Sequence, residues 1–330
     1  MRRSTRTAAA AALALAACAS APRLPDAVVI PTGDGNLMRF EAAGVTVLDA
    51  DGRELATFAN RAGTAPCGGA LSMASQLAVV AFERQLAVTD LGGTAEPVWI
   101  PLPAPLSAHA VAVADDRCAL VADSGRGCVV QLPGGRVLWQ GRAGHGLDRA
   151  ALLVPTGAAE QVVVGQRGGE VVVQRLDFAR GDGLITGETV VRGMNVLGAA
   201  GSAAGAVFVA GLREASAAST RGALVQYLML ARIDLATFRV DVLQDERCAA
   251  IETRIDGMTV GPEMLAVVLD QYKRGTMLRV FDQVSGRRPA TWAFERRIVP
   301  GSSVAWLSPD YVAVVAPDGE AQVLHVVAER

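Results

Sequence analysis

The chain has 330 residues, of which 51% are hydrophobic and 19% charged, and its formal net charge is −2 at pH 7. A chain without a basic excess is a poor partner for nucleic acid, whose phosphates are bound mainly by Lys and Arg. The mean hydropathy of +0.31 comes from many short Val, Ala and Leu runs. Beyond the N-terminal leader, none of them approaches the roughly 20 apolar residues of a membrane helix, so no spanning helix is predicted there.

The N-terminus begins as a secretory leader. Arg2, Arg3 and Arg6 form a basic segment, and the uncharged apolar stretch at residues 8–14 is too short to span a bilayer. The leader ends in a leucine, two small residues and a cysteine, which are Leu15, Ala16, Ala17 and Cys18. These four residues resemble the bacterial lipobox, a resemblance that implies cleavage before the cysteine and its acylation. An ordinary Ala-x-Ala signal with an incidental cysteine is the alternative.

The lipobox divides the chain into three predicted parts: a signal peptide at 1–17, a lipidated tether at 18–25 and one domain at 26–330. Removal of the leader takes the basic count from 31 to 28 against 33 acids, so the mature net charge is −5. Ala19, in place of Asp, is similar to the pattern of lipoproteins sent to the outer membrane. The resemblance therefore implies a lipid anchor of the palmitate type, in an outer membrane, with the protein facing the periplasm.

One pattern recurs through the predicted domain: an apolar strand, a Gly-containing turn and a strand that often carries Trp. Six copies lie at residues 45–58, 86–99, 128–139, 171–191, 228–242 and 277–292, and a seventh at 312–326 stops before its last strand. Valine-rich strands precede five of them, at 77–82, 119–123, 162–165, 207–211 and 265–270. Equivalent positions 49, 90, 132, 177, 234, 282 and 326 lie 41 to 57 residues apart.

Repeats of about 40 to 50 residues with four short strands are typical of β-propeller blades, which bury their apolar faces by stacking around an axis. We therefore predict an all-β chain of four-stranded blades, seven in number, with six or eight as alternatives. A pair of two-sheet sandwiches is the competing fold. Because the seventh unit lacks an outer strand, we expect residues 27–30 to supply that strand and close the ring.

The clearest copy is CALVADSGRGCVVQLPGGRVLW at residues 118–139. Its VAD strand, short turn, V strand and GG turn resemble the NHL/YVTN type of propeller repeat. The Trp of the fourth strand is similar to that of the PQQ-like (BamB-like) propellers. Both resemblances imply a fold and not an activity. The shared repeat position of Trp99, Trp139 and Trp292 favours packing between blades over an aromatic cage.

An expanded hairpin at residues 212–226 distinguishes the fifth unit from its neighbours. Its candidate binding residues are Arg213, Glu214, Ser216, Ser219, Thr220 and Arg221. Loops on rigid scaffolds often carry recognition, and loops of about 12 to 15 residues are uncommon. A neutral insertion is the alternative.

Four cysteines follow Cys18, and an oxidising envelope compartment permits disulfides. Cys118 and Cys128 flank a predicted turn at Ser124-Gly125, and pairing about this turn places Cys128 opposite Val121. Two interpretations stay open: a Cys118–Cys128 disulfide, or two buried small apolar residues, which the offset favours.

Local motifs for catalysis are missing from the sequence. His109, His145 and His325 stand alone, there is no P-loop or complete G-x-S-x-G, and the segment that starts at Asp49 departs from a calcium loop after three residues. We therefore predict no catalytic residue, metal or cofactor, and expect a non-catalytic scaffold that binds an envelope protein. A metal-dependent hydrolase of lactonase type, with ligands drawn from several blades, is one alternative. A periplasmic sensor for a small ligand or polysaccharide is another.

Overall fold

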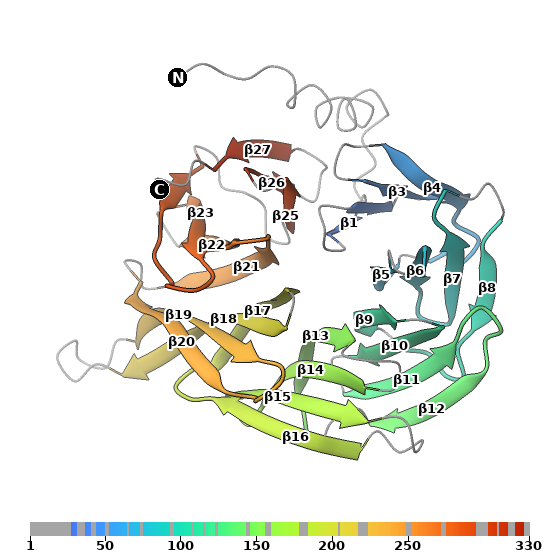
Figure 1. Ribbon diagram of the computed structural model, residues 1–330, viewed down its shortest axis with the longest axis horizontal. Helices are drawn as coiled ribbons and strands as arrows, with labels where there is room; N and C mark the ends of the chain where they lie inside the picture. The colour runs from blue at the N-terminus through green and yellow to red at the C-terminus, as the bar shows by residue number, and fades with distance from the viewer. Residues whose placement is uncertain are drawn as a thin grey trace.

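Seven antiparallel sheets surround a central axis in the computed structural model (Figure 1). The structure describes residues 28–31, 37–40, 44–49, 53–64, 66–72, 75–92, 96–106, 108–114, 116–122, 125–142, 146–155, 160–177, 184–203, 205–216, 224–248, 252–271, 275–294, 303–308, 310–315 and 321–326. All regular structure in this part of the chain is β. No helix long and apolar enough to cross a membrane occurs among these residues.

Each sheet is one blade. Six blades have four strands, and the seventh has three within the described residues. The innermost strands are β1 (Val28–Pro31), β5 (Gly68–Ser72), β9 (Ala108–Ala114), β13 (Arg149–Pro155), β17 (Val196–Ala203), β21 (Thr253–Val260) and β25 (Ser303–Ser308). The second strands are β2 (Leu37–Phe40), β6 (Leu77–Ala81), β10 (Arg117–Ala122), β14 (Glu160–Arg167), β18 (Ala206–Ser216), β22 (Met264–Gln271) and β26 (Tyr311–Val315).

The outer strands of the blades contain the recurring sequence pattern. The third strands are β3 (Gly44–Leu48), β7 (Gln85–Asp90), β11 (Arg126–Gln131), β15 (Glu170–Asp177), β19 (Leu224–Asp234), β23 (Gly275–Asp282) and β27 (Ala321–His325). The outermost strands are β4 (Glu54–Ala59), β8 (Val98–Pro101), β12 (Val137–Arg142), β16 (Leu184–Val191), β20 (Val240–Arg247) and β24 (Ala290–Ala293). The six full copies coincide with third and fourth strands, and the valine-rich segments with second strands. The predicted seven-bladed propeller is therefore confirmed.

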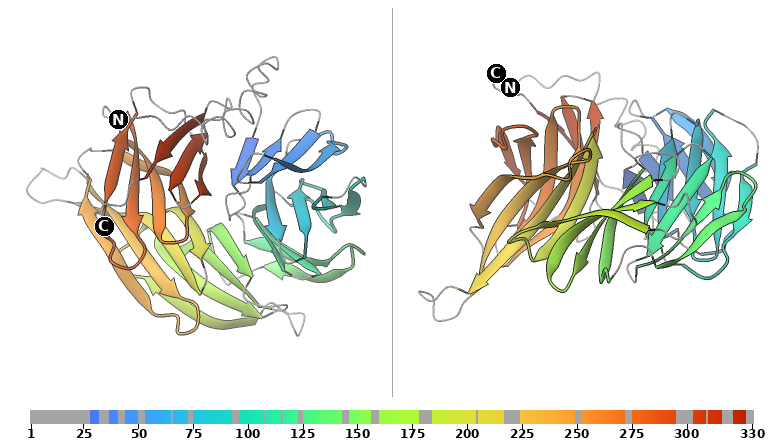
Figure 2. Two further views of the ribbon diagram at one scale, coloured as in Figure 1. Left: turned by 45° about the horizontal axis from the view of Figure 1, so that its top comes forward. Right: turned by 60° about the horizontal axis from the view of Figure 1, so that its bottom comes forward.

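The ring closes differently from the prediction. Figure 2 shows the blades standing side by side around the axis, and β1 lies beside β25 where the first blade meets the last. Yet β1 is hydrogen-bonded to β2, from Val28 opposite Phe40 to Pro31 opposite Leu37, and so it belongs to the first blade. The expectation that residues 27–30 complete the seventh blade is wrong. A local hairpin closes only a short loop, whereas pairing with the last blade would close almost the whole chain at a greater entropic cost.

The core lies between the blades. The second and third strands are covered on both faces by neighbouring blades, so Val162, Val163 and Val164 are all 0% exposed. Strands buried on both faces read as continuous apolar runs instead of alternating ones, which explains the valine-rich segments. Trp139 is buried in the core between blades three and four. The packing interpretation of the tryptophans is thereby confirmed for Trp139.

The aspartates that end the third strands cap the turns that follow. The Asp282 carboxylate accepts hydrogen bonds from the N–H and hydroxyl of Ser285 at 2.6 and 2.7 Å, and Asp234 makes the same contacts with Thr237. These bonds to the charged form hold the pKa of both carboxyls below its usual value. Asp49 likewise accepts from the Arg53 N–H at 2.7 Å, as a turn residue does. The repeated aspartate is thus a turn signal.

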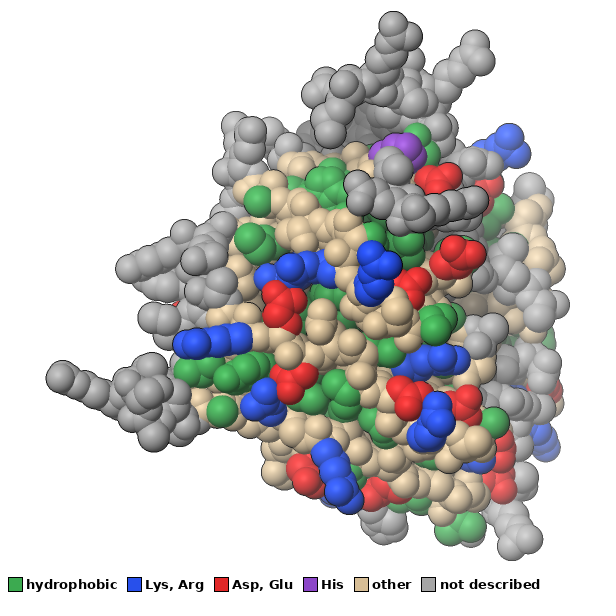
Figure 3. All heavy atoms as spheres, turned by 60° about the vertical axis from the view of Figure 1, so that its left-hand side comes forward, with side chains coloured by type: hydrophobic (Ala, Val, Ile, Leu, Met, Phe, Trp, Pro, Cys, Tyr) green, Lys and Arg blue, Asp and Glu red, His purple; other side chains and the backbone are tan. Residues whose placement is uncertain are grey.

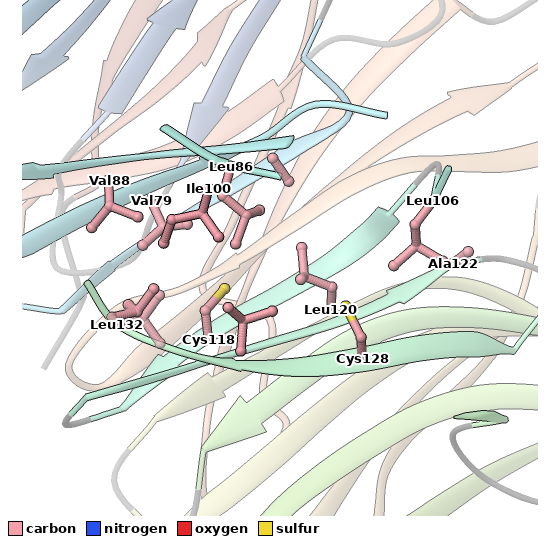
Figure 4. Packing of buried hydrophobic residues seen from close by; sticks show 13 residues of the cluster. Val79, Leu86, Val88, Ile100, Leu106, Cys118, Leu120, Ala122, Cys128 and Leu132 are labelled. Carbon is pink, nitrogen blue, oxygen red and sulfur yellow. The ribbon is translucent and has the colours of Figure 1, made fainter. Parts of the chain in front are cut away.

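Cys118 and Cys128 are free thiols in the core between blades two and three (Figure 4). Cys128 lies opposite Leu120 and not opposite Val121 as predicted. The connection has three residues and not two, and Gly125 takes the left-handed conformation with φ 73° that such a loop requires. The corrected register places both thiols diagonally on one face of the sheet, so they fill core volume without being bonded.

Candidate interaction surface

The two central strands of blade five extend past the rest of their sheet. Strands β18 and β19 have 11 residues each and stay paired as far as Ser216 opposite Leu224. The innermost strand pairs no further than Val196 with Leu212, and the outermost no further than Arg247 with Tyr227. The pairs beyond these form a free two-stranded extension roughly 10 Å long, at about 3.3 Å per residue. We call this extension, together with the Arg213–Tyr227 pair at its base, the ribbon; it comprises residues 213–216 and 224–227.

The ribbon lies on one face of the propeller, which we call the ribbon face. On this face the second strand of each blade turns into the third, and the outermost strand connects to the next blade. Arg213 and Glu214 belong to β18 and are half-buried, so they are strand residues and not loop residues as predicted. Ser216 ends β18. Ser219, Thr220 and Arg221 lie outside the described residues, as do Leu15, Ala16, Ala17 and Cys18.

Asn195, in the connection between blades four and five, holds the base of the ribbon. Its Oδ1 accepts the Glu214 N–H at 2.9 Å, and its Nδ2 donates to the Glu214 carbonyl at 3.2 Å. Its own N–H donates to the Leu212 carbonyl at 3.0 Å. One asparagine therefore satisfies the backbone of β18 where β17 has not yet begun.

Gln226 connects the other strand of the ribbon to blade six by hydrogen bonds. Its Nε2 donates to the Glu214 carboxylate at 2.8 Å, and its Oε1 accepts the Thr253 N–H at 2.6 Å. Its carbonyl accepts the Cys248 N–H at 2.8 Å. Gln226 is 9% exposed, so these bonds are largely shielded from water. Charge-assisted and shielded bonds of this kind are among the stronger ones.

Gln166 on β14 extends the same chain of contacts to blade four. Its Nε2 donates to the Asn195 carbonyl at 2.9 Å, and its Oε1 accepts the Leu197 N–H at 3.3 Å. Three consecutive blades are thus connected through the base of the ribbon. A ribbon held in this way is preorganised, which lowers the entropic cost of binding a partner.

Arg213 and Tyr227 form a rigid pair at the first ribbon position. The guanidinium lies 3.9 Å from the centre of the Tyr227 ring and donates to both carboxylate oxygens of Asp245 at 2.9 Å. Arg and Tyr are enriched among the residues that dominate protein interfaces. The side chains of Arg213 and Asp245 keep 32% and 39% of their surface exposed, so a partner can reach them.

Blades five and six are joined at the outer side by charged contacts. Glu246 accepts two hydrogen bonds of 2.8 Å from Arg288 and lies 3.6 Å from the guanidinium of Arg279. Burial lowers the pKa of Arg279, and the Glu246 carboxylate opposes this shift. On the side of the molecule drawn in Figure 3, acidic and basic side chains are interspersed and form no single-sign patch. The ribbon is therefore the more distinctive surface.

The channel side of the propeller is poor in carboxylates. Among the seven innermost strands, β21 alone contributes one, Asp256, and this group is paired with Arg254 at 2.6 Å. Within the described part of the chain, no group of three or more His, Cys, Asp or Glu side chains could hold a metal ion.

The polar residues at the ribbon base could not be predicted from the sequence. Asn195 and Gln166 belong to no sequence motif, and their hydrogen-bond partners lie 19 to 31 residues away. Gln226 offered one signal, because a polar side chain in the largely apolar first part of β19, residues 224–231, needs a hydrogen-bond partner.

Comparison with known proteins places the fold but not the activity. No family model matches the sequence, and no curated protein matches it. Among solved structures, the chain is similar to hydrazine synthase of Kuenenia stuttgartiensis, with a TM-score of 0.67, 12% identity and coverage of 93% of this chain and 97% of that one. BamB from Moraxella catarrhalis gives a TM-score of 0.54 at 13% identity, covering 90% and 95%. A WD40 domain from Neurospora crassa gives 0.61 at 11% identity, covering 90% and 88%.

These neighbours include a hydrazine synthase, BamB and a WD40 domain, and identities this low define the fold class alone: the chain is a seven-bladed β-propeller. Its function has to be argued from its own surface.

Proposed function

We propose that this chain is a non-catalytic protein-interaction scaffold, held in the bacterial envelope by a lipid on Cys18. The observation that carries the proposal is the ribbon, a two-stranded extension whose base is hydrogen-bonded to the blades on either side. The backbone groups of Glu214 and Gln226 are already bonded, so the strand edges open to a partner lie beyond them, at residues 215–216 and 224–225. Strand edges not covered by another strand readily pair with an extended segment of another protein. The ribbon is therefore the surface that we assign to the partner.

The sequence supplies the support for the envelope location. The basic leader and the lipobox residues Leu15 to Cys18 favour an N-terminal lipid anchor, and Ala19 favours the outer membrane. Two or more acyl chains suffice for stable attachment. The similarity to BamB of Moraxella catarrhalis concerns the propeller architecture alone.

The carboxylate content of the innermost strands favours a scaffold over the metal-dependent hydrolase. A channel metal in such an enzyme needs several oxygen ligands from different blades. The innermost strands contribute Asp256 alone, and Arg254 already binds it.

Photo-crosslinking in native membranes tests the ribbon. A photoreactive residue placed at Ala215 should give a covalent adduct with one envelope protein. The same residue placed at Thr237, in the turn between β19 and β20 on the opposite face, should not give that adduct. Adducts from both positions in equal yield, or from neither, would overturn the assignment of the ribbon.

The anchor is tested separately. Replacement of Cys18 by Ser should release the protein from the membrane fraction into the soluble periplasm. Membrane association that persists and requires detergent would contradict the lipid anchor, while leaving the crosslinking result intact.

A further inference from the structure

A groove of about 410 Å³ separates blades two and three on the ribbon face. One wall is the connection between these blades, residues 103–106, and the other is the outer half of blade three. Its volume falls within the range of small-molecule sites, about 300 to 1,000 Å³. Neither the ribbon nor the proposed partner contact involves this groove.

The wall of blade three presents four side chains on one face. Arg126 pairs with Arg142 across strands β11 and β12, and Cys128 pairs with Gln140 two positions along. Residues two apart on a strand share a face, and Cys128 lies in the core toward blade two, so all four face the groove. On the other face, Trp139 covers Gly141 so closely that a Cβ there would lie 2.9 Å from its ring. This packing fixes the strand, and with it the direction of Gln140 and Arg142.

The floor of the groove is apolar. Leu106 and Cys128 are 8% and 3% exposed and belong to the same core cluster. Burial raises the pKa of Cys128 to about 12, so its thiol is neutral at physiological pH. The opposite wall is completed by Pro103 and Pro105, whose rings restrict the backbone.

Backbone hydrogen bonds fix the wall formed by residues 103–106. The Leu106 N–H donates to the Glu83 carbonyl at 2.7 Å, and the Leu102 N–H donates to the Arg84 carbonyl at 2.8 Å. Both bonds fasten the connection to the turn between β6 and β7. A preformed site loses less entropy on binding than one that must be ordered.

The groove has a positive rim. Arg126 and Arg142 are both exposed and lie directly opposite each other in the register of β11 and β12. Within the described part of the chain, no acid pairs with Arg142. The Arg142 guanidinium can therefore take an anionic partner, because guanidinium groups bind carboxylates with two parallel hydrogen bonds. Gln140 adds a further donor on the same wall.

We propose that this groove binds a small organic carboxylate with an aliphatic or aromatic body, the carboxylate at Arg142 and the body against Leu106 and Cys128. The apolar floor disfavours a bare inorganic anion, and the charge of Arg142 disfavours a neutral ligand. The groove lies between blades two and three, so binding there needs neither the ribbon nor the lipid anchor.

Titration of the purified protein with 4-phenylbutyrate tests the proposal, with 4-phenylbutyramide as the neutral analogue and inorganic phosphate as the anion without a body. The acid should bind with a Kd below about 1 mM, a modest affinity for a ligand of its size. The amide and phosphate should bind at least about tenfold more weakly. Methyl resonances of Leu106 should shift on binding, whereas those of Leu278 in blade six should not.

Variants locate the carboxylate. Arg142→Gln should weaken binding of the acid about tenfold or more, and Arg142→Lys should retain part of it, since only the guanidinium bonds two oxygens in parallel. Arg136→Gln removes the same charge from an exposed position in the β11–β12 turn and should leave binding unchanged. Equal binding of acid and amide, an unaffected Arg142→Gln variant or no shift at Leu106 would each overturn the proposal.

Discussion

The side-chain amide of Asn195 takes the place of a neighbouring strand for the backbone of Glu214. Its oxygen accepts the Glu214 N–H at 2.9 Å, and its nitrogen donates to the Glu214 carbonyl at 3.2 Å. The innermost strand begins only at Val196, so Asn195 continues the ladder by one position with a side chain. The ribbon therefore leaves the blade with its backbone already satisfied.

Replacement of Asn195 by Ala should lower the free energy of unfolding by about 1 to 3 kcal/mol, because two half-buried backbone groups lose their partner. Amide exchange at Glu214 should accelerate. Urea denaturation and hydrogen exchange measure the two effects. Asn195→Asp keeps an oxygen that can accept the Glu214 N–H, so this variant should lose less stability.

The matched control for this variant is Asn60→Ala. Asn60 also makes two hydrogen bonds through its amide, with the Ala62 N–H and the Thr64 carbonyl, but in a turn whose residues 61, 63 and 64 are exposed, so water can replace them more easily. An equal loss in both variants would show that Asn195 has no special role at the ribbon.

A close contact between blades requires glycine at position 286. Gly286 has φ 68°, and a Cβ at this position would lie 2.2 Å from the Leu243 carbonyl oxygen of blade five. Gly92 has a similar φ of 75° but no atom within 4 Å of its virtual Cβ. Gly286→Ala should therefore destabilise the protein by about 1 to 3 kcal/mol more than Gly92→Ala, since only the first adds overpacking to backbone strain. Thermal or urea unfolding of the two variants checks this, and equal losses would contradict it.

The architecture could be predicted because its determinants are local. Each blade is built from strands that follow one another in sequence, and its turns are marked by residues such as Asp282 and Gly286. Burial on both faces also leaves a plain signal in the second strands, as at Val162 to Val164. Blade number and order follow from these signals alone.

The features that were wrong or missed depend on partners far away in sequence or on one residue of loop length. Strand β1 could pair with the first or with the seventh blade, and the strands of both blades are apolar in sequence. The predicted register of Cys128 was wrong because the connection before β11 contains three residues and not two. The ribbon base rests on Gln226 and Thr253, which are 27 residues apart and belong to different blades. The periodicity of the sequence does not predict such a contact.

The turn after β23 should make stability depend on pH. Hydrogen bonds from Ser285 lower the pKa of Asp282, so the carboxylate stabilises the fold above its unfolded pKa of about 3.9 and loses this effect as the pH falls through the lower folded value. Asp282→Ala should cost about 1 kcal/mol at pH 7, as loss of a cap does, and less below pH ~4. Urea midpoints between pH 7 and pH 3 measure the difference. Asp282→Asn keeps the acceptor oxygen and should cost less, with no such pH dependence.

The thiols of blade three should be inert in the native protein. Burial raises the pKa of Cys128 to about 12, and burial together with the neighbouring Cys128 raises that of Cys118 further. At pH 8 only about one Cys128 in ten thousand is then a thiolate, the reactive form. In a Cys18→Ser background, a thiol reagent should modify the partly exposed Cys67 first.

In guanidinium without reductant, the same reagent should modify four thiols, since Cys118, Cys128 and Cys248 become accessible as well. Cys67→Ser is the control and should abolish the fast phase in the native protein.

The buried Cys128 thiol should also make stability depend on pH. Because the folded pKa of Cys128 lies above the unfolded value of about 8.5, the stabilising effect of the neutral thiol is complete below that pH and is lost as the pH rises toward 12. Cys128→Ala should therefore lose less stability than the parent between pH 9 and pH 11. Only two reactive thiols after unfolding would instead show that Cys118 and Cys128 are joined in a disulfide.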